Sequence, residues 1–314
     1  MLVFRSFRVP KVFYNSIIAI GNFDGFHKGH QEVVKKAKKI SKNNKTKVGV
    51  LTFEPHPKTY FNKKFDNFRL TPFREKYKVL KDAKVDFMIN IRFDKKFLET
   101  TAIDFIEEKL VKDLKVLAVV TGFDFVFGNN KVGNVDYMRK YADRTKNFKY
   151  YEVPEVKNEN NLQISSSNIR QFLRDGKIEY ANKLLTRKWT ISGKVLEGDK
   201  KAREIGFKTA NLKINNFCNI KNGVYLVSIK FGRNQNRNYF GIANFGTKPT
   251  FNNNNTLLEV HIFNFNSEIY NKRIYVSFFK FIRAEKKFET VEKLKDQIIK
   301  DINQVKNDKL FKNN

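Results

Sequence analysis

The stretch "AIGNFDGFHKGH" (residues 19–30) decides how the first half of this chain is interpreted. An apolar run leads into it, and three glycines are spaced through it. Two of the chain's four histidines, His27 and His30, stand three positions apart inside it. A metal site, a phosphate site and an ordinary turn all fit such a pattern, and the elements on either side separate the three.

Short apolar runs alternate with amphipathic segments through the first half of the chain. Apolar side chains that recur every three or four positions indicate helices, whereas short continuous apolar runs indicate buried strands. This alternation predicts an α/β domain with a parallel sheet and helices on both faces. The expected strands are 16–21, 47–53, 85–93 and 115–122, and the expected helices are 30–42, 71–83 and 101–114.

The pattern changes after about residue 186, where five strand-like runs follow one another with Gly, Asn and Lys between them. That spacing predicts an antiparallel barrel or sandwich. A single helix with an apolar stripe, from Val291 to Val305, ends the pattern. The length of 314 residues favours two domains. We therefore predict domains at 1–186 and 187–314.

The position of the opening stretch favours phosphate. It follows a buried strand that ends at Gly21 and precedes a helix that begins near His30. Ligands of a parallel α/β sheet bind beyond the carboxyl ends of the strands, and the free N–H groups of a helix N-terminus attract phosphate. A metal needs further ligands, and only His56 and His261 remain among the histidines. A helix cap with chance histidines is the remaining alternative.

The formal charge of +30 raises the possibility of a nucleic-acid-binding protein. The excess is mostly lysine spread along the whole chain, and no RNA-binding motif accompanies the aromatic residues. We expect no dedicated nucleic-acid partner.

The single cysteine, Cys218, excludes a disulfide within the chain and a cysteine-based zinc site. No apolar run has the length of a membrane span, so we expect a soluble, cytoplasmic protein with no membrane partner.

Five segments of the first half resemble the adenylyltransferase half of the prokaryotic bifunctional riboflavin kinase/FMN adenylyltransferase family. "GNFDGFHKGH" resembles the HxGH signature of nucleotidyltransferases. The other four segments occur in the family's order: "TFEPHPKTYF" (52–61), "RLTPFREKYKVL" (69–80), "VTGFDFVFGNNKVGN" (120–134) and "ISSSNIR" (164–170). The resemblance implies a Rossmann-like nucleotidyltransferase domain that transfers the adenylyl group of ATP to FMN, releasing pyrophosphate and forming FAD.

The resemblance also implies roles for single residues. His27 and His30 would act on the ATP phosphates and on the charge that develops during transfer. Ser165 or Ser166 can cap the helix that begins there, and Arg170, one turn further, can reach an anion at that end. The full set expected to bind ATP or phosphate in this domain is Gly21, Asn22, Phe23, Gly25, Ser165, Ser166 and Arg170; the residues expected near the flavin are Asp124 and Asn129.

The second half resembles riboflavin kinase, which implies an antiparallel β-barrel closed by the terminal helix. The matching segments are "GKVLEGDKKAREIGFKTANL" (193–212), "GVYLV" (223–227), "GIANFGTKPTF" (241–251), "LEVHIFNFNSEIYNKRI" (258–274) and "IRAEKKFETVEKLKDQI" (282–298). The implied reaction transfers phosphate from ATP to riboflavin and forms FMN. The expected partners of the whole chain are therefore ATP, riboflavin, FMN and FAD.

Three residues are expected to carry the kinase chemistry. Thr209 and Asn211 occupy alternate positions of an extended segment, so their side chains point the same way. Two oxygen ligands in that arrangement suit Mg²⁺ bound together with ATP, and we expect no tightly bound metal. By resemblance, Glu259 is the base that accepts the proton of the riboflavin 5′-hydroxyl. Gly198 and Gly206 bracket a loop that can close over the nucleotide.

The kinase half departs from the family pattern at four positions: Ala202, Lys208, Asn264 and Asn271. Asparagine tolerates left-handed backbone angles, so Asn271 is a mild replacement for a turn glycine.

Two enzymatic alternatives stay open. One is an FMN adenylyltransferase whose C-terminal domain is a weakened kinase or only binds flavin. The other is a nucleotidyltransferase with a different acceptor.

Overall fold

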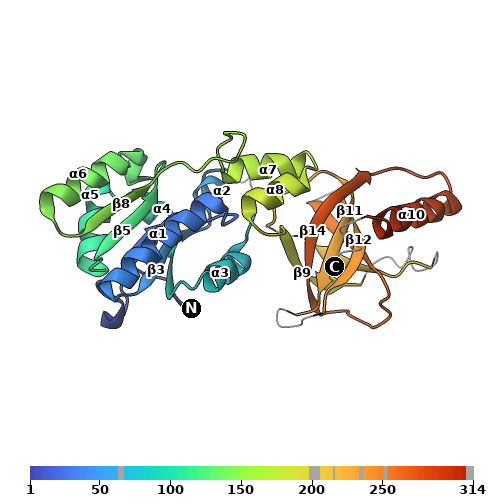
Figure 1. Ribbon diagram of the computed structural model, residues 1–314, viewed down its shortest axis with the longest axis horizontal. Helices are drawn as coiled ribbons and strands as arrows, with labels where there is room; N and C mark the ends of the chain where they lie inside the picture. Colours follow the sequence, from blue (N-terminus) through green and yellow to red (C-terminus); the bar gives the residue numbers. More distant parts are fainter. Residues whose placement is uncertain (63–66, 198–205, 215, 233–236, 251–252, 309–314) are drawn as a thin grey trace. The chain divides into compact units, whose positions relative to one another are not determined.

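The computed structural model describes residues 1–62, 67–197, 206–214, 216–232, 237–250 and 253–308. Contacts between residues divide the chain into two compact units, Met1–Ser166 and Ser167–Asn314, which we call the α/β unit and the barrel unit. Both are drawn in Figure 1. In the described residues no helix is long and apolar enough to cross a membrane.

The α/β unit is built on a six-stranded sheet in the order β1-β4-β3-β2-β5-β8, and every neighbouring pair is parallel. This confirms the predicted parallel sheet. The two edge strands, β1 and β8, were not predicted; β1 has only three residues, too few to show a period. The strands are β1 (Leu2–Phe4), β2 (Ile17–Ile20), β3 (Val48–Glu54), β4 (Phe87–Arg92), β5 (Ala118–Gly122) and β8 (Lys149–Val153).

Helices cover both faces of this sheet. Successive strand residues point to opposite faces, so Ile18 belongs to one apolar cluster and Ile17 to the other. The predicted helix at 101–114 forms as one short α-helical stretch, α5, that continues as a π-helix. The helical segments are η1 (Lys11–Phe13), α1 (Lys28–Asn44), α2 (Pro57–Phe61), α3 (Phe73–Asp82), α4 (Lys95–Leu98), α5 (Ala102–Asp104), the π-helix η3 (Phe105–Asp113), η4 (Asn129–Lys131) and α6 (Val135–Thr145).

The order of the strands creates a switch point between β2 and β5. From β2 the chain adds β3 and β4 on one side, and later β5 and β8 on the other. Ligands of open α/β sheets bind at the carboxyl ends of the strands where the order reverses. The loop after β2 and the loop after β5, which is followed by the small hairpin β6 (Val126–Phe127) and β7 (Gly133–Asn134), both begin at this point.

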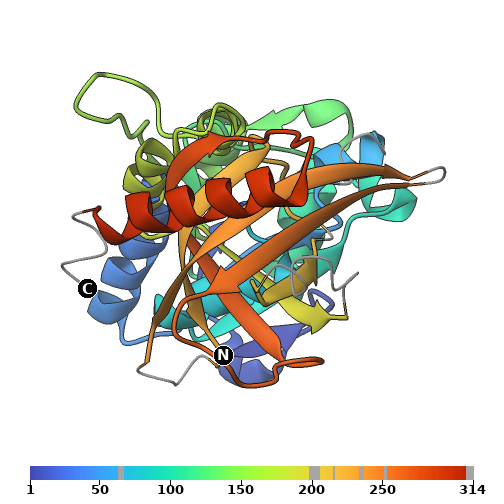
Figure 2. The same cartoon turned by 90° about the vertical axis from the view of Figure 1, so that its right-hand side faces the viewer.

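The barrel unit contains a closed barrel of six antiparallel strands in the order β10-β13-β12-β11-β14-β9. Of the two predicted architectures, the barrel is therefore correct. Helix α10 (Val291–Lys306) lies against the barrel, where Val305 packs with Val224 and Leu226, and Figure 2 shows it crossing the strands. The strands are β9 (Thr190–Leu196), β10 (Thr209–Lys213), β11 (Gly223–Lys230), β12 (Tyr239–Thr250), β13 (Asn253–Ile262) and β14 (Arg273–Ala284).

Two helices ahead of the barrel, α7 (Ser166–Arg174) and α8 (Ile178–Leu185), belong to the barrel unit except for Ser166, which is the last residue of the α/β unit. The Asn182 side chain joins α8 to the barrel, because its Nδ2 donates to the Phe278 carbonyl at 2.9 Å and its Oδ1 accepts from the Trp189 N–H at 2.7 Å. The division by contacts thus falls in the first turn of α7, after Ser166. The boundary at 186/187 stays a prediction.

Candidate active sites

The loop between β2 and α1 has an unusual backbone. Phe23, Gly25 and Phe26 have φ angles of 49°, 82° and 42°, all in the left-handed region. Glycine adopts these angles at little cost, whereas phenylalanine does so only where the surroundings hold it. The loop turns the chain sharply from the end of β2 to the start of α1.

His27 and His30 meet at the N-terminus of α1. His27 is the N-cap residue, so the helix begins at Lys28, slightly before its predicted start. The two imidazole rings are stacked, with centroids 3.8 Å apart and an interplanar angle of 23°. A Cβ on Gly29 would lie 3.2 Å from the His27 ring, so glycine leaves that ring its place. The structure thus brings together the two histidines that the sequence singled out.

The residues before the histidines support this pair. The Phe23 side chain is 1% exposed, and its ring stands edge-on to His30 with centroids 5.3 Å apart. A Cβ on Gly21 would lie 3.3 Å from the Phe23 ring, which explains the glycine there. The Asn22 carbonyl accepts a hydrogen bond of 3.3 Å from Thr52, while its side-chain Oδ1 is buried with no hydrogen-bond partner among the described residues.

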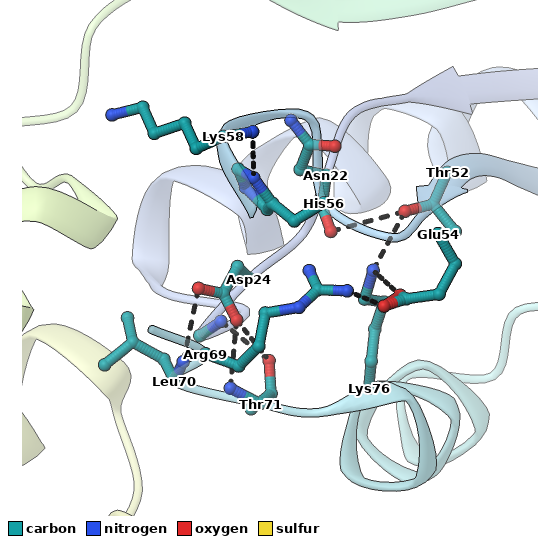
Figure 3. A network of polar contacts seen from close by, with 11 residues as sticks. Asn22, Asp24, Thr52, Glu54, His56, Lys58, Arg69, Leu70, Thr71 and Lys76 are labelled. Carbon is teal, nitrogen blue, oxygen red and sulfur yellow. Dashed lines mark hydrogen bonds and ion pairs between the residues drawn. The ribbon is translucent and has the colours of Figure 1, made fainter. Parts of the chain in front are cut away.

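A buried polar network, which sequence reasoning missed, lies behind this loop (Figure 3). Arg69 pairs with Glu54, whose other oxygen is 3.6 Å from the Nζ of Lys76. Lys76 is fully buried and donates to Thr52 at 3.1 Å. Burial, followed by the charge of Arg69, lowers the pKa of Lys76 to about 7, and Asp24 opposes that shift only in part.

The other predicted residues of the α/β unit lie at the ends of its strands and at the start of α7. Ser166 donates to the Asp24 carbonyl at 2.8 Å, so "ISSSNIR" reaches the histidine loop, and Ser165 precedes it directly. The two residues expected near the flavin are both exposed, Asp124 just after β5 and Asn129 in η4. Arg170 is buried and belongs to the barrel unit.

In the barrel unit, strand register brings the predicted kinase residues together. Asn211 on β10 pairs directly with Glu259 on β13, so their side chains share one face of the sheet. Thr209 lies two positions before Asn211 and faces the same way. Asn244 on β12 pairs with Glu259 from the other side, and sequence reasoning missed it because nothing local marks that register. The result is a polar row across three strands.

Three of the four departures from the family pattern lie in described residues: Lys208, Asn264 and Asn271. Asn264 and Asn271 have φ angles of 53° and 63°, which confirms that Asn271 serves as a left-handed turn residue. The Lys208 carbonyl accepts a 3.0 Å hydrogen bond from Nδ1 of His261. Burial lowers the pKa of His261, so the ring stays neutral near pH 7. Residues 198–205, with Gly198, Ala202 and Arg203, lie outside the described residues.

Gly206 is described and has a φ of 88°, with open space where a Cβ would be. Its backbone conformation, and not crowding, therefore calls for glycine.

In the part of the chain that the structure describes, no group of three or more His, Cys, Asp and Glu residues could hold a metal ion. His56, one of the spare histidines, instead caps α2 by accepting from the Lys58 N–H at 3.1 Å.

Fold and site together define a two-domain nucleotide-using enzyme, with a nucleotidyltransferase-type α/β domain and a kinase-type β-barrel. Two family models match in that order: FAD synthetase over residues 9–168 and Riboflavin kinase over residues 185–308. The chain belongs to the bifunctional riboflavin kinase/FMN adenylyltransferase family.

Full-length relatives agree with this assignment. The bifunctional riboflavin kinase/FMN adenylyltransferase of Buchnera aphidicola subsp. Schizaphis graminum is 39% identical over 95% of both chains. That of Listeria monocytogenes is 37% identical, covering 91% of this chain and 90% of its own. A crystal structure named Macrolide-efflux Protein, from Streptococcus pneumoniae, has a TM-score of 0.86 at 30% identity and 98% coverage of both chains.

Proposed function

We propose that this chain makes FAD from riboflavin in two steps, each at its own site. In the first, riboflavin receives the γ-phosphoryl group of ATP in the barrel unit, giving FMN and ADP. In the second, an FMN phosphate oxygen bonds to the α-phosphorus of another ATP in the α/β unit, and the bond to the leaving pyrophosphate breaks. Membership of the family supports both activities.

The stacked histidine pair is the observation that carries the second step. His27 and His30 stand at the N-terminus of α1, beside the switch point of the sheet, where N–H groups and imidazoles converge. A polyphosphate there meets several donors at once, and charge that develops on the leaving oxygen is stabilised. No covalent intermediate is needed, because FMN itself supplies the nucleophile. The rate then depends on alignment.

The polar row of the barrel supports the first step. Glu259 would accept the proton of the riboflavin 5′-hydroxyl as the oxygen–phosphorus bond forms. Thr209 and Asn211 present hydroxyl and amide oxygens on the same face, the hard donors that Mg²⁺ takes together with substrate phosphates. Bound Mg²⁺ would neutralise phosphate charge. The His261 bond to the Lys208 carbonyl supports the backbone just ahead of Thr209, which argues for an active kinase despite Lys208.

Two variants separate the steps in one experiment. Each protein receives riboflavin, ATP and Mg²⁺, and chromatography resolves FMN from FAD. We expect His30→Ala to accumulate FMN with at least about a hundredfold loss of FAD formation. We expect Glu259→Gln to lose FMN formation while still converting supplied FMN to FAD. Each variant is the folding control for the other.

Retained FAD formation in His30→Ala, within about threefold of wild type, would exclude the histidine role. If the wild-type chain forms FAD only from supplied FMN, the barrel is not an active kinase, and the adenylyltransferase-only alternative holds. The cytoplasmic location and the lack of a nucleic-acid partner stay predictions.

A further inference from the structure

The loop before the histidines is held by a latch formed by Asp24 and Thr71. Asp24 is 1% exposed, and its carboxylate accepts from the Leu70 N–H at 3.2 Å and the Thr71 N–H at 2.9 Å. The Thr71 hydroxyl donates to the same carboxylate at 3.3 Å and accepts from the Gly25 N–H at 2.7 Å. Figure 3 shows these contacts from close by.

The latch joins segments far apart in the sequence. On one side of Asp24 lies "RLT" (69–71), and on the other the Ser166 hydroxyl donates to the Asp24 carbonyl at 2.8 Å. The aspartate is thus held both through its side chain and through its backbone. A buried carboxylate is stable only when such donors surround it, so its place in the loop is closely defined.

The backbone on either side of Asp24 needs this support. Phe23 and Phe26 are left-handed without being glycine, and such residues persist only where their surroundings over-determine them. Released from the latch, both would relax toward ordinary angles. Phe23 would then withdraw its ring from His30, and Phe26 would move the chain that leads directly into His27.

We propose that Asp24 and Thr71 are positioning residues for adenylyl transfer: they hold the loop in the one conformation that presents His27 and His30 to ATP as a stacked pair. This rests on the proposed role of the two histidines. Neither Asp24 nor Thr71 is assigned contact with substrate; both act through the loop. The segment "RLTPFREKYKVL" thereby gains a role, which is to supply Thr71 to the latch.

The first test is Asp24→Asn, which keeps the size of the side chain but turns an amide N–H₂ toward one of two backbone N–H donors. We expect kcat for FAD formation from FMN to fall about a hundredfold, with KM for ATP changed less than about threefold. Riboflavin kinase activity of the same chain should stay within about twofold of wild type. Asp86→Asn is the matched control, because that carboxylate also accepts a backbone N–H, from Val48, but at the amino ends of β3 and β4, away from the histidine loop.

A pair of variants at Thr71 separates positioning from simple loss of fold. Thr71→Val removes only the hydroxyl, and we expect kcat for FAD formation to fall about tenfold. Thr71→Ser restores the hydroxyl, and we expect it to recover wild-type kcat within about twofold. A serine variant as slow as the valine variant would contradict the latch.

Histidine NMR gives a readout that loss of stability alone would not move. The chain has four histidines, His27, His30, His56 and His261, so ¹⁵N-histidine labelling yields few signals. We expect Asp24→Asn and Thr71→Val to shift the ring signals of His27 and His30 and to leave that of His261, in the barrel unit, unchanged. Unchanged signals for the stacked pair, or an equal fall in both enzymatic activities, would overturn the proposal. An active His30→Ala would instead refute the histidine role, whatever the latch variants do.

Discussion

The adenylyltransferase loop depends on buried side chains, whereas the kinase row depends on backbone pairing. In the α/β unit, Asp24 and Thr71 fix the loop through contacts between segments that share no regular element. In the barrel, Asn211 and Glu259 face each other because their strands are in register. Single polar substitutions distant from the reacting atoms should therefore harm the first site, while the second should fail when its strands are forced apart.

The largest expected effect comes from Gly241→Ala on β12. A Cβ there would lie 2.1 Å from the His261 carbonyl oxygen, so β12 and β13 must separate. We expect the free energy of unfolding of the barrel unit to fall by about 3 kcal/mol, with loss of kinase activity and retention of adenylyl transfer. The chain's only tryptophan, Trp189, is buried in the barrel unit, and its fluorescence reports that transition.

Gly246→Ala on the same strand is the matched control. The three atoms nearest to its Cβ would all belong to the flexible side chain of Glu285, the first at 3.1 Å. We expect it to leave kinase activity close to wild type. If Gly241→Ala behaved the same way, backbone pairing would not be what holds the kinase row.

The next effect is a pH dependence caused by Lys76. Its pKa is about 7 in the folded protein against 10.5 as a free side chain, so between these values the unfolded chain binds the extra proton. The α/β unit should thus gain stability as pH rises from 7 toward 10, by up to about 1.4 kcal/mol per pH unit from this group. Below pH 7 the full cost of burying the charge is present in the folded state.

Lys76→Met should remove that slope, and circular dichroism during urea unfolding at pH 7 and pH 9 measures it. Lys81→Met, on an exposed position of the same helix, should keep the wild-type slope. An unchanged slope in Lys76→Met would mean that the lysine is not the group responsible.

The smallest effect is expected for His261→Phe, which keeps an aromatic ring on β13 but removes the Nδ1 donor to the Lys208 carbonyl. The loss of one hydrogen bond should cost the barrel unit about 1 kcal/mol. We expect kinase activity to fall a few fold, because the backbone ahead of Thr209 is less well held, while FAD formation from supplied FMN is unchanged. Wild-type kinase kinetics in this variant would show that the bond to Lys208 is dispensable.

Much of this architecture could be predicted because the spacing of apolar residues within each short segment indicates a helix or a strand. The buried run 16–21 and the helix after His30 needed only their own residues to be recognised, and their sequence order implied a site beyond the strand end. The barrel was harder, since strand runs alone fit a sandwich equally well. Closure depends on β9 pairing with both β10 and β14, which no local pattern records.

The supporting residues could not be predicted for the same reason. Asp24 and Thr71 are 47 positions apart, and each alone resembles an ordinary polar residue near a turn. Lys76 misleads more strongly, because lysine on an amphipathic helix predicts an exposed position, yet here the residue is fully buried beside Glu54. Asn244 could be recognised as part of the polar row only once the register of β12 against β13 was known. Long-range pairing, and not residue type, defines these positions.

The closure of the barrel also bears on how this chain avoids aggregation. It has 32 phenylalanines, nine of them in the described strands, and exposed strand edges are where such chains join one another. The described barrel strands form a closed ring, so each has a partner on both sides. In the sheet, one edge is the three-residue β1, and the other, β8, begins with the charged Lys149. A chain rich in aromatic residues thus presents short or charged strand edges to its neighbours.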